Sequence, residues 1–118
     1  MYFKIGDLVN LYCYKNNYFF FEEKIKIIDR KETYACVYYY YLDPTNLRLQ
    51  RDGYGCRGLI NNWTVGENLV PSNHYPSIES LTKMLLDQNN QIREEASRVY
   101  EVVKNLDQSK IKFFKIEL

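Results

Sequence analysis

The chain has 118 residues, a formal net charge of +1 and a hydrophobic content of 46%. That length is enough for one domain with a modest core, and the composition is typical of a folded protein. The balanced charge lacks the basic excess that nucleic-acid binders usually carry. No run approaches the ~18 apolar residues of a membrane span, and no signal-peptide pattern opens the chain. We therefore expect an intracellular protein with no membrane partner.

The first seventy residues predict a series of short strands. Residues 8–14 and 18–28 predict two strands, and the second alternates apolar with charged side chains from residue 22 onward. A tyrosine-rich third strand follows at residues 34–42. A short strand at residues 47–49 leads into an Asp-Gly hairpin turn. Residues 62–71 predict a brief strand or helical turn closed by a proline. About five short, bent strands favour a small SH3-like or Tudor-like barrel, since closure removes the sheet edges.

The rest of the chain predicts one amphipathic helix and a terminal strand. Ser77 is the expected N-cap, and apolar residues then recur at helical spacing as far as residue 106, with a polar run at residues 87–91 where the helix could divide. Residues 111–118 alternate lysine with apolar residues and predict a strand that pairs with an edge of the barrel. The domains expected are a barrel at residues 1–72, and a helix and strand at residues 73–118 packed on it or extending from it.

The helix admits a second interpretation as a coiled coil. Asn89 would be the polar residue that fixes the register, and the apolar seam would serve helix-mediated assembly. The heptads are few, so packing on the barrel is the favoured interpretation. The seam residues are Leu85, Ile92, Val99 and Leu106.

The sequence offers few residues that could form a catalytic site or a metal site. The single histidine, His74, lies in a linker, and the three cysteines lack the close spacing of structural zinc sites. The odd number and wide separation of Cys13, Cys36 and Cys56 do not predict a disulfide framework, so we expect free thiols. Adjacent carboxylates such as those at residues 22–23 and 94–95 diverge in a strand or helix and predict solvated faces. We expect no enzyme, no metal and no cofactor.

The aromatic residues are the unusual feature. The chain holds 12 tyrosines, six phenylalanines and one tryptophan, Trp63. Residues 34–41 carry five of these tyrosines, and a small sheet cannot bury both faces of such a run. Clustered surface aromatics suggest a binding site. Three or four rings that converge from different strands can enclose a methylated ammonium group, because its cation is attracted to the ring faces.

The order of four motifs resembles the chromo barrel domain of the MRG family of chromatin proteins. The motifs are Ile-Gly-Asp-Leu-Val-Asn-Leu-Tyr at residues 5–12, Phe-Phe-Glu-Glu-Lys-Ile at 20–25, Tyr-Ala-Cys-Val-Tyr at 34–38 and Asn-Trp-Thr-Val-Gly-Glu-Asn-Leu-Val at 62–70. The chain departs from the family in replacing one tryptophan by Tyr41, in lacking a second tryptophan and two acids before Trp63, and in an insertion at residues 42–60.

The resemblance implies a non-enzymatic reader of methyl-lysine in histone tails, which would act in the nucleus. Carried over by position, the aromatic cage would consist of Phe21, Tyr38, Tyr41 and Trp63, and Asp43 or Glu67 would supply the missing acid.

Two alternatives use the same barrel. One is a small intracellular protein-interaction factor, for example of phage or parasite origin, whose tyrosine-rich face is a protein interface. The other is a nucleic-acid-binding barrel in which the rings stack on bases, and it alone predicts binding that falls steeply with salt.

Overall fold

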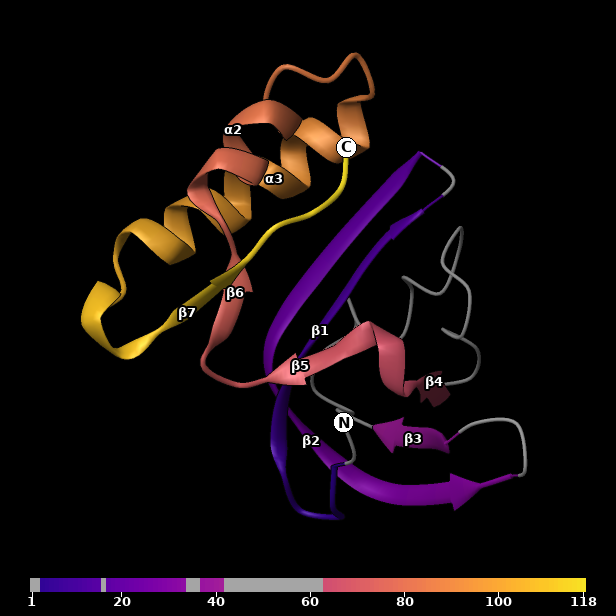
Figure 1. The fold of residues 1–118 in the computed structure, drawn as a ribbon. Helices are drawn as coiled ribbons and strands as arrows, with labels where there is room; N and C mark the ends of the chain where they lie inside the picture. Colours follow the sequence, from indigo (N-terminus) through magenta and orange to yellow (C-terminus); the bar gives the residue numbers. More distant parts are fainter. Residues whose placement is uncertain (1–2, 16, 34–36, 42–62) are drawn as a thin grey trace.

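The computed structural model describes residues 3–15, 17–33, 37–41 and 63–118, and it leaves the side chains of residues 38–41, 63–65 and 67 undescribed. The predicted strand at residues 47–49 and its hairpin turn lie outside these ranges. The described part contains a five-stranded antiparallel sheet in the order β4-β3-β2-β1-β5 (Figure 1). Its strands are β1 (Leu8–Lys15), β2 (Tyr18–Glu32), β3 (Val37–Tyr41), β4 (Trp63–Val65) and β5 (Leu69–Pro71).

The sheet is open as far as it is described. Strands β4 and β5 stand at its two ends, and the short 3-10 helix η1 (Gly66–Asn68) joins one to the other along the chain. The antiparallel strands and the brief strand and helical turn predicted near residues 62–71 are confirmed. In the described part of the chain, no pairing between β4 and β5 closes these five strands into a barrel.

A bulge in β2 divides the sheet into two halves. The register with β1 shifts between Val9, opposite Ile25, and Leu11, opposite Glu22, so β2 carries one extra residue there. Lys24 takes the left-handed conformation with φ 56°, which is uncommon for a residue other than glycine. Such bulges bend the strand and increase its twist. The early part of β2 therefore pairs with β1, whereas residues 27–32 pair with β3.

The side chain of Asn10 connects this bulge to the exit from the sheet. Asn10 is fully buried in β1, and its Oδ1 accepts a hydrogen bond from the Lys24 backbone N–H at 2.9 Å. Its Nδ2 donates to the carbonyl oxygens of Ser72 at 3.2 Å and His74 at 2.7 Å. One amide group thus holds the bent part of β2 and the turn after β5 against β1.

The C-terminal part is a helical layer with a small sheet of its own. Strand β6 (His74–Pro76) leads into helix α2 (Ile78–Met84), which is followed by helix α3 (Asn90–Lys104), the 3-10 turn η2 (Gln108–Lys110) and strand β7 (Lys112–Phe114). Strands β6 and β7 pair in parallel. The prediction that the terminal strand pairs with a barrel edge is therefore wrong in the described part of the chain.

The helical region begins as predicted and divides at its polar run. The Ser77 side chain accepts a hydrogen bond from the Ser80 N–H, which confirms the predicted N-cap. The helix is interrupted between α2 and α3, where Asn89 becomes a new N-cap by accepting from the Gln91 and Ile92 backbone. Asn89 is thus a capping residue and not the polar position of a coiled coil.

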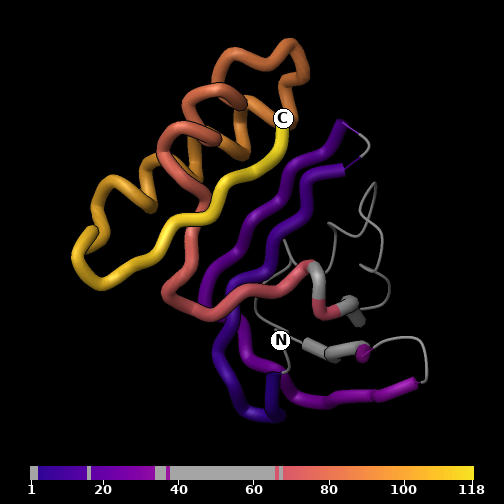
Figure 2. Tube along the Cα trace, in the orientation of Figure 1, coloured from indigo at the N-terminus to yellow at the C-terminus, as the bar shows by residue number. Residues whose placement is uncertain are grey.

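Two apolar clusters lie on opposite faces of the β1–β2 hairpin. Phe20, Ile25 and Ile27 of β2 belong to the cluster enclosed by the bent sheet, whereas Phe19 and Phe21 belong to the cluster under the helices. Figure 2 shows the C-terminal segment, in yellow, running beside this hairpin, and the rings of Tyr12 and Phe114 are 4.7 Å apart there. Alternation along β2 therefore gives each cluster its phenylalanines.

Helix-mediated assembly through the proposed seam is not available in this fold. Ile92 and Val99 are almost fully buried in the cluster under the helices, and Leu85 and Leu106 pack against its margin. These side chains already bury their apolar surface within the chain, as the favoured interpretation expected.

None of the helices in the described residues has the length and apolarity needed to cross a bilayer.

The prediction of free thiols is wrong for Cys13. This residue is buried in β1 at 2% exposure, and its sulfur takes part in a disulfide bond.

Substitution of Asn10 tests its connecting role. We expect Asn10→Ala to lower the free energy of unfolding by about 2–4 kcal/mol, because it leaves the Lys24 N–H and two carbonyl groups without a partner. Asn10→Asp retains the acceptor but loses the donor, so it should also destabilise. The exposed Asn105→Ala is the control, expected within about 0.5 kcal/mol. Urea unfolding measures all three, and equal midpoints for Asn10→Ala and the control would contradict the role.

Candidate functional site

The predicted binding residues concentrate on the paired strands β3 and β4. Tyr40 lies opposite Trp63 in the register, and Tyr38 lies opposite Val65. Tyr41 is the last residue of β3 and lies opposite Ile27 of β2. The backbone thus brings Tyr38, Tyr41 and Trp63 onto adjacent strands, while their side chains lie outside the described part.

The far half of β2 positions this pair of strands. Residues 27–32 form the ladder with β3, beyond the bulge at Lys24. Val37 at the start of β3 and Ile27 of β2, which pairs with the last residue of β3, are buried at 9% and 0% exposure in the cluster enclosed by the sheet. Strand β3 is therefore held at its start by the apolar side chain of Val37 and along its length by pairing with β2, and β4 pairs along its other edge.

Phe21 does not lie with the other three predicted cage residues. Its ring is 1% exposed and packs 5.5 Å from the ring of Tyr75, in the cluster under the helices. Phe21 pairs with Tyr12, six positions along β2 from the residue that pairs with Tyr41, which is roughly 20 Å at the usual rise of a strand. A ring buried among helices offers no open face to a ligand, so Phe21 is a core residue in this fold.

The two predicted acids remain predictions. Asp43 lies outside the described residues. Glu67 lies in η1, immediately after β4, and its side chain is also outside the description. The backbone therefore places Glu67 four residues after Trp63 on the segment that joins β4 to β5.

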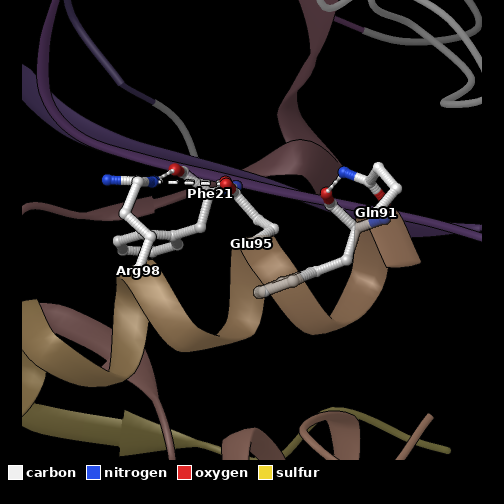
Figure 3. A network of polar contacts seen from close by, with 5 residues as sticks. Phe21, Gln91, Glu95 and Arg98 are labelled. Carbon is white, nitrogen blue, oxygen red and sulfur yellow. Dashed lines mark hydrogen bonds and ion pairs between the residues drawn. The ribbon is translucent and has the colours of Figure 1, made fainter. Parts of the chain in front are cut away.

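A second polar arrangement, which the sequence did not predict, connects α3 to the free edge of β2 (Figure 3). Alternate residues of a strand direct their N–H and C=O groups to the same edge. Phe19 donates its N–H to Gln91 Oε1 at 2.9 Å, and its carbonyl oxygen accepts from Gln91 Nε2. Two residues further on, the Phe21 N–H donates to Glu95 Oε2 at 2.9 Å, and its carbonyl oxygen accepts from Arg98 Nη2.

These helix side chains occupy the place of a neighbouring strand. Asn89 extends the series, since its Nδ2 donates to the carbonyl oxygen of Asn17 at 2.8 Å. Glu95 is 5% exposed and forms an ion pair with Arg98 at 3.1 Å. The prediction that Glu95 lies on a solvated face is therefore wrong. Its spacing from Gln91 and Arg98 was the available signal, because positions four and three apart share one face of a helix.

Neighbouring carboxylates stabilise the charged form of the Arg98 side chain. Partial burial acts against the charged form, but the hydrogen bond and the attraction to Glu95 outweigh it, with smaller contributions from Glu22 and Glu23, and the pKa of Arg98 is raised overall. The guanidinium therefore stays charged while it binds the Phe21 carbonyl. The arrangement can satisfy buried peptide groups, and it contains no activated nucleophile.

Tyr75 provides a further buried polar contact beside this network. Its hydroxyl donates to Glu23 Oε2 at 2.5 Å, and its side chain is 2% exposed. Burial raises the pKa of Tyr75 well above its usual value, and the hydrogen bond and charge of Glu23 raise it further. The hydroxyl is therefore a permanent donor at neutral pH and cannot serve as a base there.

The single histidine and the cysteines were also weighed for chemistry. His74 is the first residue of β6, and its Nδ1 contacts Oδ1 of Asn73, in the preceding turn, at 2.8 Å. Within the described ranges, no group of three or more histidine, cysteine or carboxylate side chains could hold a metal ion. Cys36 and Cys56 lie outside those ranges.

Comparison with known proteins adds no relative to this description. No family model, curated protein or solved structure matches the chain.

Replacement of Glu95 tests whether α3 substitutes for a strand. We expect Glu95→Ala to cost about 2–4 kcal/mol of stability, because it removes the acceptor of the Phe21 N–H and the carboxylate partner of the half-buried Arg98 guanidinium. The matched control is Glu94→Ala, an exposed neighbour on the same helix turn. Amide hydrogen exchange should show faster exchange at Phe21 in Glu95→Ala alone. Unchanged protection of that amide would contradict the assignment.

The buried Tyr75 predicts a specific loss of stability in alkali. Below the usual tyrosine pKa of about 10, the folded and unfolded states both hold the proton, so the contribution is fully present. Above it the unfolded chain releases the proton while the folded chain retains it, and stability falls as pH rises towards the folded pKa. Urea unfolding between pH 8 and about 11 should give a smaller decline for Tyr75→Phe than for the parent chain. An equal decline in the free energy of unfolding for both proteins would show that Tyr75 does not cause the loss of stability in alkali.

Proposed function

We propose that this chain is a non-enzymatic binding module that holds a methylated lysine of a protein segment, such as a histone tail, at the β3–β4 strands. One observation carries the proposal: the register sets Trp63 directly opposite Tyr40, between the positions of Tyr38 and Tyr41 on the neighbouring strand. Three aromatic residues from two paired strands are thereby gathered within a short stretch of backbone.

The chemistry of the ligand follows from these residue types. A methylated ammonium group keeps its positive charge but is poorly hydrated, so it gains from contact with electron-rich ring faces. Tyrosine and tryptophan provide such faces, and tryptophan provides the strongest. The proposed cage consists of Tyr38, Tyr40 and Trp63, because alternate positions of β3 share a face with the residue opposite Tyr40. Phe21 and Tyr41 are left out of it. Asp43, two residues after Tyr41, or Glu67, four residues after Trp63, would add charge attraction.

We also propose that the sheet is a variant of the SH3-like barrel. Two features support this: the bulge at Lys24, which bends β2 so that it serves both halves of the sheet, and the three-residue link Gly66–Asn68 between the end strands β4 and β5. Small barrels use such bulges and short connections at their corners. In this proposal the module acts in the nucleus, where methylated histone tails are found, as a part of a larger chromatin assembly.

The fluorescence of Trp63, the only tryptophan, tests the proposal directly. We expect a saturable change on titration with a trimethyl-lysine peptide and none with the unmethylated peptide of the same sequence. Tyr38→Ala and Tyr40→Ala should each weaken binding about five- to thirtyfold, as loss of one cation–ring contact of about 1–2 kcal/mol predicts. Tyr100→Ala, on the distant helix α3, is the matched control and should bind as the parent does.

The outcomes separate the classes of ligand. Equal binding of methylated and unmethylated peptides would show a general protein interface on β3–β4 and no cage. Binding of single-stranded nucleic acid that falls steeply with salt would indicate base stacking. An absence of response at millimolar peptide would exclude the methyl-lysine proposal.

A further inference from the structure

Strand β7 has an edge that no described strand covers. It belongs to a two-stranded sheet and pairs only with β6 in the described part of the chain (Figure 1). The Lys112 N–H donates to the Asn73 carbonyl at 2.8 Å, and the Phe114 carbonyl accepts from the Ser77 N–H at 2.9 Å. Because bonded residues alternate along a strand, the peptide groups of Phe113 point away from β6.

The side chains around this edge are apolar at the centre and basic at both ends. Phe113 is a large apolar residue and is 42% exposed. Lys112 and Lys115 flank it, and both are exposed and form no ion pair with a described residue. Lys110 contacts Asp107 only at 3.9 Å, with 81% of its side chain exposed. The edge therefore presents one exposed ring among three cations.

We propose that the outer edge of β7 binds an extended, acidic protein segment as an added strand. The Phe113 peptide group would supply main-chain hydrogen bonds, as in other cases of strand addition. The Phe113 ring would contact an apolar residue of the segment, and Lys112 and Lys115 would pair with its carboxylates. This site lies on the helical layer and is independent of the proposed methyl-lysine site on β3–β4.

The lysines select the kind of partner. Lysine on an edge strand discourages pairing with another edge, since its charge must be brought close to the incoming strand. A second copy of this chain would bring the same cations to its own β7, and like charges across an interface are repelled. An acidic segment turns this repulsion into attraction, so charge complementarity favours it over self-association.

A fluorescent peptide that alternates glutamate with valine is a suitable probe. Fluorescence anisotropy with the whole chain should show saturable binding to this peptide and none to the same peptide with lysine in place of glutamate. An analogue with N-methyl groups on every backbone nitrogen keeps every side chain but has no N–H to donate to a strand ladder on either edge. We expect that analogue to lose binding. Equal binding of the N-methylated analogue, or of single-stranded DNA of the same charge, would overturn strand addition at β7.

Variants locate the site. The double variant Lys112→Glu with Lys115→Glu should bind the acidic peptide at least about tenfold more weakly. Each substitution removes an exposed ion pair with the peptide and replaces it with repulsion. Lys4→Glu, before β1, with Lys26→Glu, on β2, makes the same change in net charge away from β7 and should bind as the parent does. Both pairs are exposed, so circular dichroism should show the parent fold in each. Equal weakening by the two double variants would show that net charge, and not β7, determines binding, and would overturn the proposal.

Discussion

The peptide groups on the early part of β2 impose the main constraint on this fold. Strand β1 satisfies one edge of that segment, and β3 pairs only with residues 27–32 further along. The N–H and C=O groups of Phe19 and Phe21 on the other edge are covered by a helical layer, where a missing hydrogen bond is costly. Helix α3 meets this requirement with Gln91, Glu95 and Arg98, which take the place of a sixth strand.

This arrangement explains why the two parts of the chain share a core. The side chains that bond to β2 stand beside apolar ones on the same helix, so Ile92, Ala96 and Val99 are carried into contact with Phe19 and Phe21. The polar contacts fix the register of helix against strand, and the apolar contacts supply most of the stabilisation. Asn10 fixes the turn after β5 in the same way, and it thereby sets where the helical layer begins.

The same division separates the proposed recognition surfaces. The half of β2 before the bulge is committed to the helices, and its Phe21 ring is buried there. The half after the bulge carries β3 and β4, where Tyr38, Tyr40 and Trp63 lie on paired strands. A ligand at β3–β4 and a segment at β7 would occupy different parts of the molecule, so both could bind at once.

The sequence by itself determined the local features of this protein. The strands β1 and β2, the cap at Ser77, the division of the helix near Asn89 and the brief strands around Trp63 all depend on neighbours within a few residues, and all are confirmed. The spacing of apolar residues along a strand or helix and the identity of a capping residue are properties of a short segment, so a sequence shows them directly. The grouping of tyrosines in β3 with Trp63 in β4 could also be predicted, because consecutive strands of a small sheet tend to pair.

Only the tertiary structure decided where Phe21 and Glu95 lie and which strand pairs with β7. Phe21 has the aromatic side chain that a cage requires. However, the bulge at Lys24 and the change of partner along β2 place it under the helices. Glu95 looks solvated beside Glu94 until its partner, a backbone amide 74 residues away, is known. Strand β7 pairs with β6 because the helices return the chain there. Each of these outcomes depends on contacts between distant segments, and such contacts leave no local pattern in the chain.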